Sequence, residues 1–269
     1  MTICIAAICE SCKVVVVASD RMLTAGFLAL EFEHPDSKIE ELSDSCVGLT
    51  AGDALAHTEL FRACRQHVQQ LKSPQVELIA NEIKEQFIAM RQKRAEEEIL
   101  NPRGFTLNQF YKEGLINRIP GDLAMMIDRS IRDRSYPLSI LLAGVDDSGA
   151  HIYSIEDPGM VNCFDQLGYD AIGSGDRHAL YSIVDKEHSA DSKLNDTIFT
   201  VYEAKKRAEL APGVGEAFEI AFITRERIRY LTISEKNQLD KIYIQKTKPR
   251  QKEIAEAISG LTFEDKEKE

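Results

Sequence analysis

The chain has 269 residues, 43% of them hydrophobic and 29% charged, a balance that excludes disorder over its whole length. Its formal net charge of −11 argues against a general nucleic-acid function, which requires a basic surface. The longest apolar runs, residues 14–18 and 138–145, fall short of the roughly 18–20 residues that a membrane-spanning helix requires. We therefore expect one large or two small globular domains, with neither nucleic acid nor membrane as a partner.

The first residues and the cysteines indicate a cytoplasmic chain. Residues 1–5 place no basic residue ahead of the apolar stretch, which is atypical of a secretory signal peptide. Six cysteines in a chain of this length do not form a disulfide framework, so we expect free thiols. Cys9 and Cys12 have the C-x-x-C spacing but lack the second pair of a zinc site, and a plain hairpin explains them.

The first third of the chain predicts two strand pairs followed by two helices. Strands are expected over residues 2–8, 13–19, 37–42 and 46–50, and helices over 55–71 and from Pro74 to about 98. Residues 14–17 are four consecutive valines, which predicts a strand covered on both faces. The short polar connections between the paired strands predict hairpins.

The rest of the chain contains a second block of strands and helices. Residues 101–135 mix prolines and glycines with short apolar pieces, and we interpret them as a partly helical insertion. Strands are expected at 138–145 and 151–155, helices at about 177–187 and 194–210, and a last hairpin at 217–224 and 227–233. We predict one domain over 2–245 with an insertion at about 100–136, then a charged C-terminal tail over 246–269 that is helix-prone at 254–258.

The order of these elements predicts an α+β fold. Helices occur in pairs between blocks of strands and do not alternate singly with strands, which argues against a doubly wound βαβ sheet. The pattern is typical of two packed antiparallel sheets with a helix pair on each outer face, a four-layer αββα sandwich.

Several motifs of cofactor and metal chemistry are missing from the sequence. Residues 173–176, Gly-Ser-Gly-Asp, lack the third glycine of a dinucleotide loop. The sequence contains no Walker A, G-x-S-x-G or H-E-x-x-H motif. His57 and His67 are ten residues apart, which is not the spacing of a metal pair on a helix. We expect neither a cofactor nor a bound metal.

Thr2 carries two reactive groups if Met1 is removed. The first residue then holds a β-hydroxyl and a free α-amine, whose pKa of roughly 7.7–8 suits a base near neutral pH. A threonine hydroxyl activated by its own amine is a known nucleophile. Because many chains begin with Met-Thr, Thr2 taken alone is better explained as an ordinary strand residue.

The motifs that follow Thr2 make the pattern more specific. In chain order they are Ala18-Ser19-Asp20-Arg21, Thr24-Ala25-Gly26, Lys38-Ile39, Ala51-Gly52-Asp53 and Ile172-Gly173-Ser174-Gly175. With Thr2 at the head of the first strand, this order resembles the β-type subunits of the proteasome and the related bacterial two-component protease, which are N-terminal-nucleophile (Ntn) hydrolases. The resemblance covers about residues 2–90 and 138–233, and leaves out the insertion and the tail.

The resemblance implies a role for three residues around the hydroxyl. Thr2 would be the nucleophile, with its amine as the general base. Lys38 would be the buried cation beside the hydroxyl, where its charge favours ionised oxygen. Asp20 would pair with Lys38 and keep it charged. A turn residue and a solvated strand residue are the plain alternatives for Asp20 and Lys38, and their separation is two residues longer than the family pattern.

Three further residues have roles implied by the resemblance. The backbone N–H of Gly52 would stabilise the oxyanion, Thr24 would align the substrate backbone as an added strand, and Ser174 would hydrogen-bond the threonine amine. A tight turn into a helix also explains Gly52, and an N-cap explains Ser174. The family places an Asp and a Ser in the loop before its last hairpin; residues 210–216 contain neither, and Asp176 or Glu216 could substitute.

The function implied is a threonine-type peptide-bond hydrolase, a proteasome-like endopeptidase. Its substrate would be a peptide or an unfolded protein, its assembly a homo-oligomeric ring, and an ATPase unfoldase a further partner. Two alternatives stay open: a non-catalytic subunit used in ring assembly, and an Ntn amidase or peptide ligase with an amine in place of water as acceptor.

Overall fold

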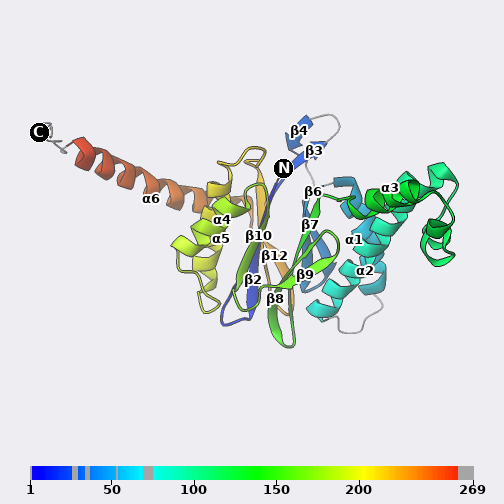
Figure 1. The fold of residues 1–269 in the computed structure, drawn as a ribbon. Helices are drawn as coiled ribbons and strands as arrows, with labels where there is room; N and C mark the ends of the chain where they lie inside the picture. Colours follow the sequence, from blue (N-terminus) through cyan, green and yellow to red (C-terminus); the bar gives the residue numbers. More distant parts are fainter. Residues whose placement is uncertain (1, 26–29, 34–36, 53, 69–74, 260–269) are drawn as a thin grey trace, which may run out of the picture. The chain divides into compact units, whose positions relative to one another are not determined.

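The computed structural model describes residues 2–25, 30–33, 37–52, 54–68 and 75–259. Some residues of the predictions above lie outside the described residues: Met1, Gly26, Asp53, Pro74, residues 69–71 of the first expected helix and the end of the expected tail. The chain divides into two compact units, Met1–Tyr230 and Leu231–Glu269. The first unit is α+β and contains two antiparallel five-stranded sheets (Figure 1).

The first sheet has the strand order β10-β1-β2-β11-β12. Its strands are β1 (Ile3–Cys9), β2 (Val14–Asp20), β10 (Tyr169–Gly173), β11 (Phe218–Ile223) and β12 (Ile228–Tyr230). The predicted first hairpin is confirmed: β1 pairs with β2 so that Cys4 lies opposite Ser19. Every residue of β2 is buried, as the four-valine run predicted, and so is every residue of β1.

The second sheet has the order β5-β6-β7-β8-β9. Its strands are β5 (Ile39–Ser43), β6 (Cys46–Gly52), β7 (Leu138–Asp146), β8 (Gly149–Glu156) and β9 (Met160–Cys163). A separate antiparallel pair, β3 (Met22–Ala25) and β4 (Leu30–Glu33), follows β2 in the chain. Strands β3, β4 and β9 were not predicted from the sequence, because four-residue strands are too short to show a clear alternation.

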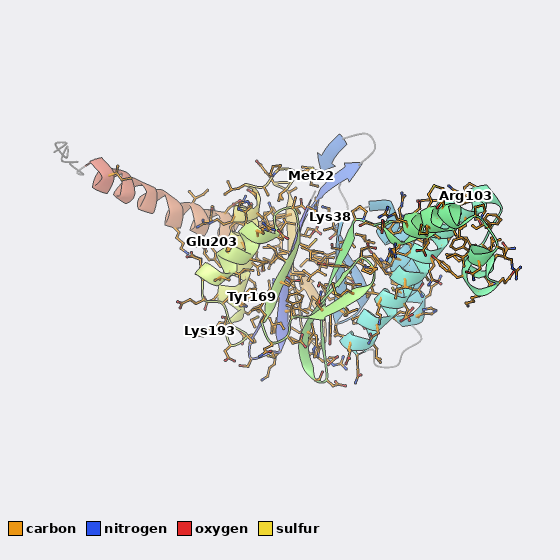
Figure 2. The ribbon with its side chains drawn as sticks, in the orientation of Figure 1. Met22, Lys38, Arg103, Tyr169, Lys193 and Glu203 are labelled. Carbon is orange, nitrogen blue, oxygen red and sulfur yellow. The ribbon has the colours of Figure 1, made fainter. Side chains whose placement is uncertain are left out.

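The two sheets face each other, and a helix pair covers the outer face of each (Figure 1). Helices α4 (Asp176–Asp185) and α5 (Leu194–Ala208) contact the first sheet, while α1 (Ala54–Val68) and α2 (Val76–Ala95) contact the second. Alternate residues of β1 and β2 pack with the inner face of the second sheet in one buried cluster. Side chains fill the space between the layers (Figure 2), and this arrangement is compatible with the sandwich predicted from the sequence.

The expected insertion is partly helical. It contains η2 (Asn101–Arg103), η3 (Asn108–Lys112), η4 (Leu115–Asn117) and α3 (Gly121–Arg132), and the π-helix η1 (Glu96–Leu100), which continues α2, leads into it. Leu100, Phe110 and Ile127 are its fully buried centre, and eight partly buried hydrophobic residues pack around them. The insertion therefore has a small core of its own. In Figure 2, Arg103 lies away from Lys38.

The second unit contains the helix α6 (Ile233–Ser259). The last strand was expected to reach residue 233, but β12 ends at Tyr230, because a capping box starts the helix there. The Glu235 amide donates to Thr232 Oγ1 at 3.2 Å, and the Thr232 amide donates to Glu235 Oε2 at 2.8 Å. Helix α6 runs across residues 245 and 246, and the predicted domain boundary there stays a prediction. No described helix offers the apolar length that crossing a bilayer requires.

Candidate active site

Strand pairing brings Thr2 and Asp20 together, and the start of the second sheet adds Lys38. Thr2 directly precedes β1, Asp20 is the last residue of β2, and Lys38 directly precedes β5. Because β1 and β2 are antiparallel, the start of one lies beside the end of the other. All three side chains are buried, with Asp20 at 0% exposure.

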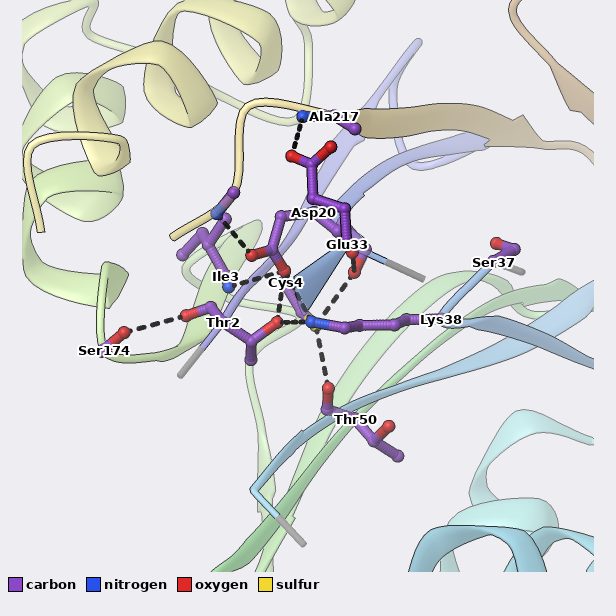
Figure 3. Close-up of polar contacts among 12 residues, drawn as sticks. Thr2, Ile3, Cys4, Asp20, Glu33, Ser37, Lys38, Thr50, Ser174 and Ala217 are labelled. Carbon is purple, nitrogen blue, oxygen red and sulfur yellow. Dashed lines mark hydrogen bonds and ion pairs between the residues drawn. The ribbon is translucent and has the colours of Figure 1, made fainter. Parts of the chain in front are cut away.

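The three side chains form one contact network (Figure 3). Lys38 Nζ lies 2.8 Å from Asp20 Oδ1 and also donates to Thr2 Oγ1, while the Thr2 hydroxyl donates to Asp20 Oδ1. A buried ion pair of this kind is stable only when further hydrogen bonds satisfy both charges. Here the cation also lies where it would stabilise negative charge on the threonine oxygen.

Backbone amides complete the surroundings of the Asp20 carboxylate. The Ile3 amide donates to Oδ1 at 3.2 Å, and the Gly215 amide donates to Oδ2 at 3.0 Å. Gly215 lies in the loop 209–217 between α5 and β11, where a Cβ atom would lie 3.1 Å from Glu33 Oε1 and 3.2 Å from Met22 Cβ. A glycine therefore permits the close approach that puts this amide on Asp20.

Gly215 was not among the predicted site residues. The sequence places it only in the loop 210–216 before the last hairpin, and no local signal shows that this loop meets a residue 195 positions earlier. The family's Asp and Ser are absent from this loop, yet one of its backbone groups contacts Asp20. Whether Asp176 or Glu216 takes over any role of those residues stays a prediction.

The turn from β10 into α4 surrounds the carbonyl group of Thr2. Ser174 Oγ lies 3.4 Å from the Thr2 carbonyl oxygen and 3.4 Å from that of Pro212. The Gly175 amide donates weakly to the same Thr2 oxygen at 3.5 Å. At Gly173, with φ of +109°, a Cβ atom would lie 2.3 Å from the Thr2 carbonyl oxygen. The structure thus brings Ser174 to Thr2, and its contact with a free amine stays a prediction.

Gly52 ends β6 opposite Leu138. Its φ is +115°, and a Cβ atom there would lie 1.9 Å from the Pro137 carbonyl oxygen, so the backbone requires glycine for structural reasons. The Cys4 thiol contacts the Thr50 carbonyl oxygen at 3.4 Å, which places the end of β6 beside the start of β1. The oxyanion role of Gly52 stays a prediction.

Thr24, the residue expected to bind substrate, lies in β3. Its backbone pairs with Glu31 of β4 in the separate two-stranded sheet. Strand β3 lies close to Asp20 in the chain, since it begins two residues after Asp20 ends β2. The role of Thr24 in substrate binding stays a prediction.

Cys4 carries a thiol, another potential nucleophile, close to Thr2. Burial raises the pKa of its thiol to about 12, and the charge of Lys38 lowers that pKa only in part. The thiol is therefore neutral at physiological pH and does not compete with a hydroxyl as an attacking group. Among the described residues, no group of three or more His, Cys, Asp or Glu side chains is arranged to hold a metal ion.

Comparison with known proteins gives one partial similarity. No protein-family model matches the chain. The chain is similar to proteasome subunit beta 2 of Staphylothermus marinus. The two are 25% identical over 109 residues, which are 40% of this chain and 50% of that subunit. The chain therefore spans about half the length of this curated relative. The similarity and the two-sheet α+β fold are compatible with the Ntn hydrolases.

Proposed function

We propose that this chain is a proteasome-like Ntn hydrolase with the αββα sandwich of that family, and that it cleaves peptide bonds with Thr2 as the nucleophile. One observation supports this most directly: the Thr2 hydroxyl contacts both a buried lysine and a buried aspartate. The partial similarity to a proteasome β subunit supports the same assignment.

The first chemical step requires the free amine that removal of Met1 creates. The amine accepts the hydroxyl proton while Thr2 Oγ1 attacks the carbonyl carbon of the substrate. The Lys38 ammonium stabilises the negative charge that develops on Oγ1. Asp20 keeps Lys38 charged, because a buried lysine without a partner tends to lose its proton.

The later steps use the residues around this centre. The Gly52 N–H donates to the oxyanion of the tetrahedral intermediate. The Thr2 ammonium then returns its proton to the leaving amine, and an ester on Thr2 remains. Water hydrolyses the ester, with the amine again as the base. In this proposal Ser174 orients the amine, and Thr24 aligns the substrate backbone as an added strand.

The decisive experiment is mass spectrometry of the intact protein after exposure to an electrophile directed at N-terminal threonine. We expect loss of Met1 and a single adduct on Thr2, together with cleavage of fluorogenic peptides. Thr2→Ala should form no adduct and should cleave peptides at least about a thousandfold more slowly, because the nucleophile is gone. The matched control, Thr2→Ser, keeps the hydroxyl and should keep the adduct.

Other outcomes lead to the alternative functions. Peptide cleavage by Thr2→Ala would contradict the mechanism. Retention of Met1 in the purified protein would block the amine and favour a non-catalytic assembly subunit. Transfer of the acyl group to a labelled amine, at the expense of hydrolysis, would favour an amidase or ligase on the same fold.

Assembly and location form a separate part of the proposal. We propose a cytoplasmic homo-oligomeric ring that encloses the active sites and receives unfolded proteins from an ATPase unfoldase. The similarity to a proteasome β subunit supports this expectation. Light scattering of the purified protein tests it, and a monomer at micromolar concentration would contradict the enclosed-ring arrangement.

A further inference from the structure

Lys205 is a buried cation that the proposed mechanism does not use. It lies in the last turn of α5, and its side chain is completely buried. Its Nζ donates to the Glu209 carboxylate and, at 2.6 Å, to the Glu216 carbonyl oxygen. The same Nζ lies 4.6 Å from the centre of the Phe218 ring. Burying an ammonium group is costly, so these contacts are what hold it in place.

The contacts of Lys205 connect α5 to the loop 209–217. Glu216, which accepts from Nζ, directly follows Gly215, whose amide donates to Asp20 Oδ2 at 3.0 Å. The carbonyl group that accepts from the Lys205 ammonium and the amide that contacts Asp20 therefore belong to neighbouring residues. Burial lowers the pKa of Lys205, whereas Glu209 and, more weakly, Asp20 raise it. Asp20 thus acts electrostatically on Lys205 as well.

We infer that Lys205 is a positioning residue that holds the loop 209–217 in place. The Gly215 amide thereby keeps its hydrogen bond to Asp20, and this bond keeps Asp20 aligned with Thr2 and Lys38. A hydrophobic residue would fill the same space in α5 but would leave the Glu216 carbonyl without its donor. The effect on reaction rate rests on the proposed function. The effect on the loop does not depend on it.

Amide hydrogen exchange in the full chain tests the inference without requiring activity. In Lys205→Met, exchange of the Gly215 amide should accelerate by about tenfold or more, because the loop opens locally. The amide of Ala221, in β11 of the first sheet, should exchange at its wild-type rate. Lys206→Met is the matched control, since Lys206 reaches Glu209 at 3.1 Å but makes no described contact with Glu216.

The outcomes separate positioning from general stabilisation. Equal acceleration at Gly215 and Ala221 would mean that Lys205 only stabilises the fold, and unchanged exchange at Gly215 would mean that it does not hold the loop. Either result overturns the inference. Lys205→Arg keeps the charge and the donor and should restore slow exchange at Gly215.

A second pair of variants covers the case in which Lys205→Met does not fold. Gly215→Pro removes the N–H that donates to Asp20, whereas Gly215→Ala keeps it and adds a Cβ that requires only a small shift of Glu33 and Met22. If the loop positions Asp20, acylation of Thr2 should be at least about tenfold slower in Gly215→Pro than in Gly215→Ala. Equal rates would overturn the inference. A wild-type protein that forms no adduct rejects the proposed function, and the exchange measurements still decide the role of Lys205.

Discussion

Two clusters in the first unit each place a hydroxyl, a basic side chain and a carboxylate in contact, one at Thr2 and one at the hairpin between β7 and β8. In the second, the hairpin cluster, Ser148 Oγ lies 2.8 Å from His151 Nε2, and His151 Nδ1 lies 2.6 Å from Oδ2 of Asp165, which follows β9. Judged by contacts alone, this second cluster resembles a hydroxyl–imidazole–carboxylate relay.

The two clusters differ in how deeply their charged side chains are buried. The side chains of Lys38 and Asp20 are 7% and 0% exposed, whereas those of His151 and Asp165 are 17% and 32% exposed. Electrostatic interactions are stronger where water is excluded, so the buried pair has more effect on a neighbouring oxygen.

A second carboxylate decides the chemistry of the hairpin cluster. Ser148 Oγ is even closer to Asp146 Oδ1, at 2.6 Å, than to the imidazole. The hydrogen bond to Asp165 raises the pKa of His151, and the charges of Asp165 and Asp146 raise it further against the effect of burial. The Ser148 hydroxyl donates its proton to Asp146 and not to the imidazole, so these contacts link the β7–β8 turn to Asp165 and do not direct the hydroxyl proton towards His151. The comparison shows that a list of contacts is not sufficient evidence of a catalytic site.

The largest effect is expected at Lys38. Lys38→Met leaves the Asp20 carboxylate buried without its cation, which should destabilise the fold by about 3–5 kcal/mol. The same change should slow acylation of Thr2 by about a thousandfold or more, because the stabilising charge is lost. Urea unfolding and intact-mass kinetics measure the two effects.

A double variant separates the two roles of Lys38. Lys38→Met combined with Asp20→Asn removes both charges and should regain part of the lost stability, but none of the activity. Normal stability in the single variant would show that Asp20 does not depend on this cation.

A smaller and pH-dependent effect is expected at the hairpin. The folded pKa of His151 is raised, so its contribution to stability is complete below its unfolded pKa of about 6.5 and disappears as pH rises through the folded value.

Burial raises the pKa of Asp146, but hydrogen bonds from Ser148 and from the Val76 amide lower it to about 2. The Asp146 contribution is therefore present above pH of about 4 and disappears as pH falls towards 2.

The two contributions overlap between about pH 4 and 6.5. His151→Asn should therefore cost roughly 1 kcal/mol at pH 5.5 and less at pH 8.5, measured by urea unfolding at both values. His188 is the control, because burial lowers its pKa and its contribution disappears as pH falls. A His151→Asn effect that grows with pH would contradict this sign.

The smallest effect is expected at Ser148. Ser148→Ala should change stability by no more than about 1 kcal/mol, because the side chain is exposed and Asp146 keeps its other donors. Peptide cleavage should stay within about twofold of wild type, since Ser148 lies outside the proposed active site. A large loss of cleavage would show that the hairpin cluster, and not Thr2, performs the chemistry.

The local pattern of the sequence predicted the long elements well. The valine run predicted β2, and helical spacing of apolar residues predicted α1, because burial of one face imposes that spacing along the chain. Local pattern failed for β3, β4 and β9, which have only four residues each. It also missed the start of α6, although Thr232 and Glu235 form a capping box that the sequence contains.

The candidate site, too, has a part that the sequence predicted and a part that it did not. The sequence alone determined which side chains carry reactive groups, and their order in the chain singled out Thr2, Asp20 and Lys38. Only the tertiary structure decided that these three meet and that the amide of Gly215, 195 residues from Asp20 in the chain, donates to Asp20. It also decided that Lys205 contacts the loop 209–217 that contains Gly215. The physical reason is that periodicity records which face of an element is buried, whereas sheet register and packing decide which distant segments become neighbours.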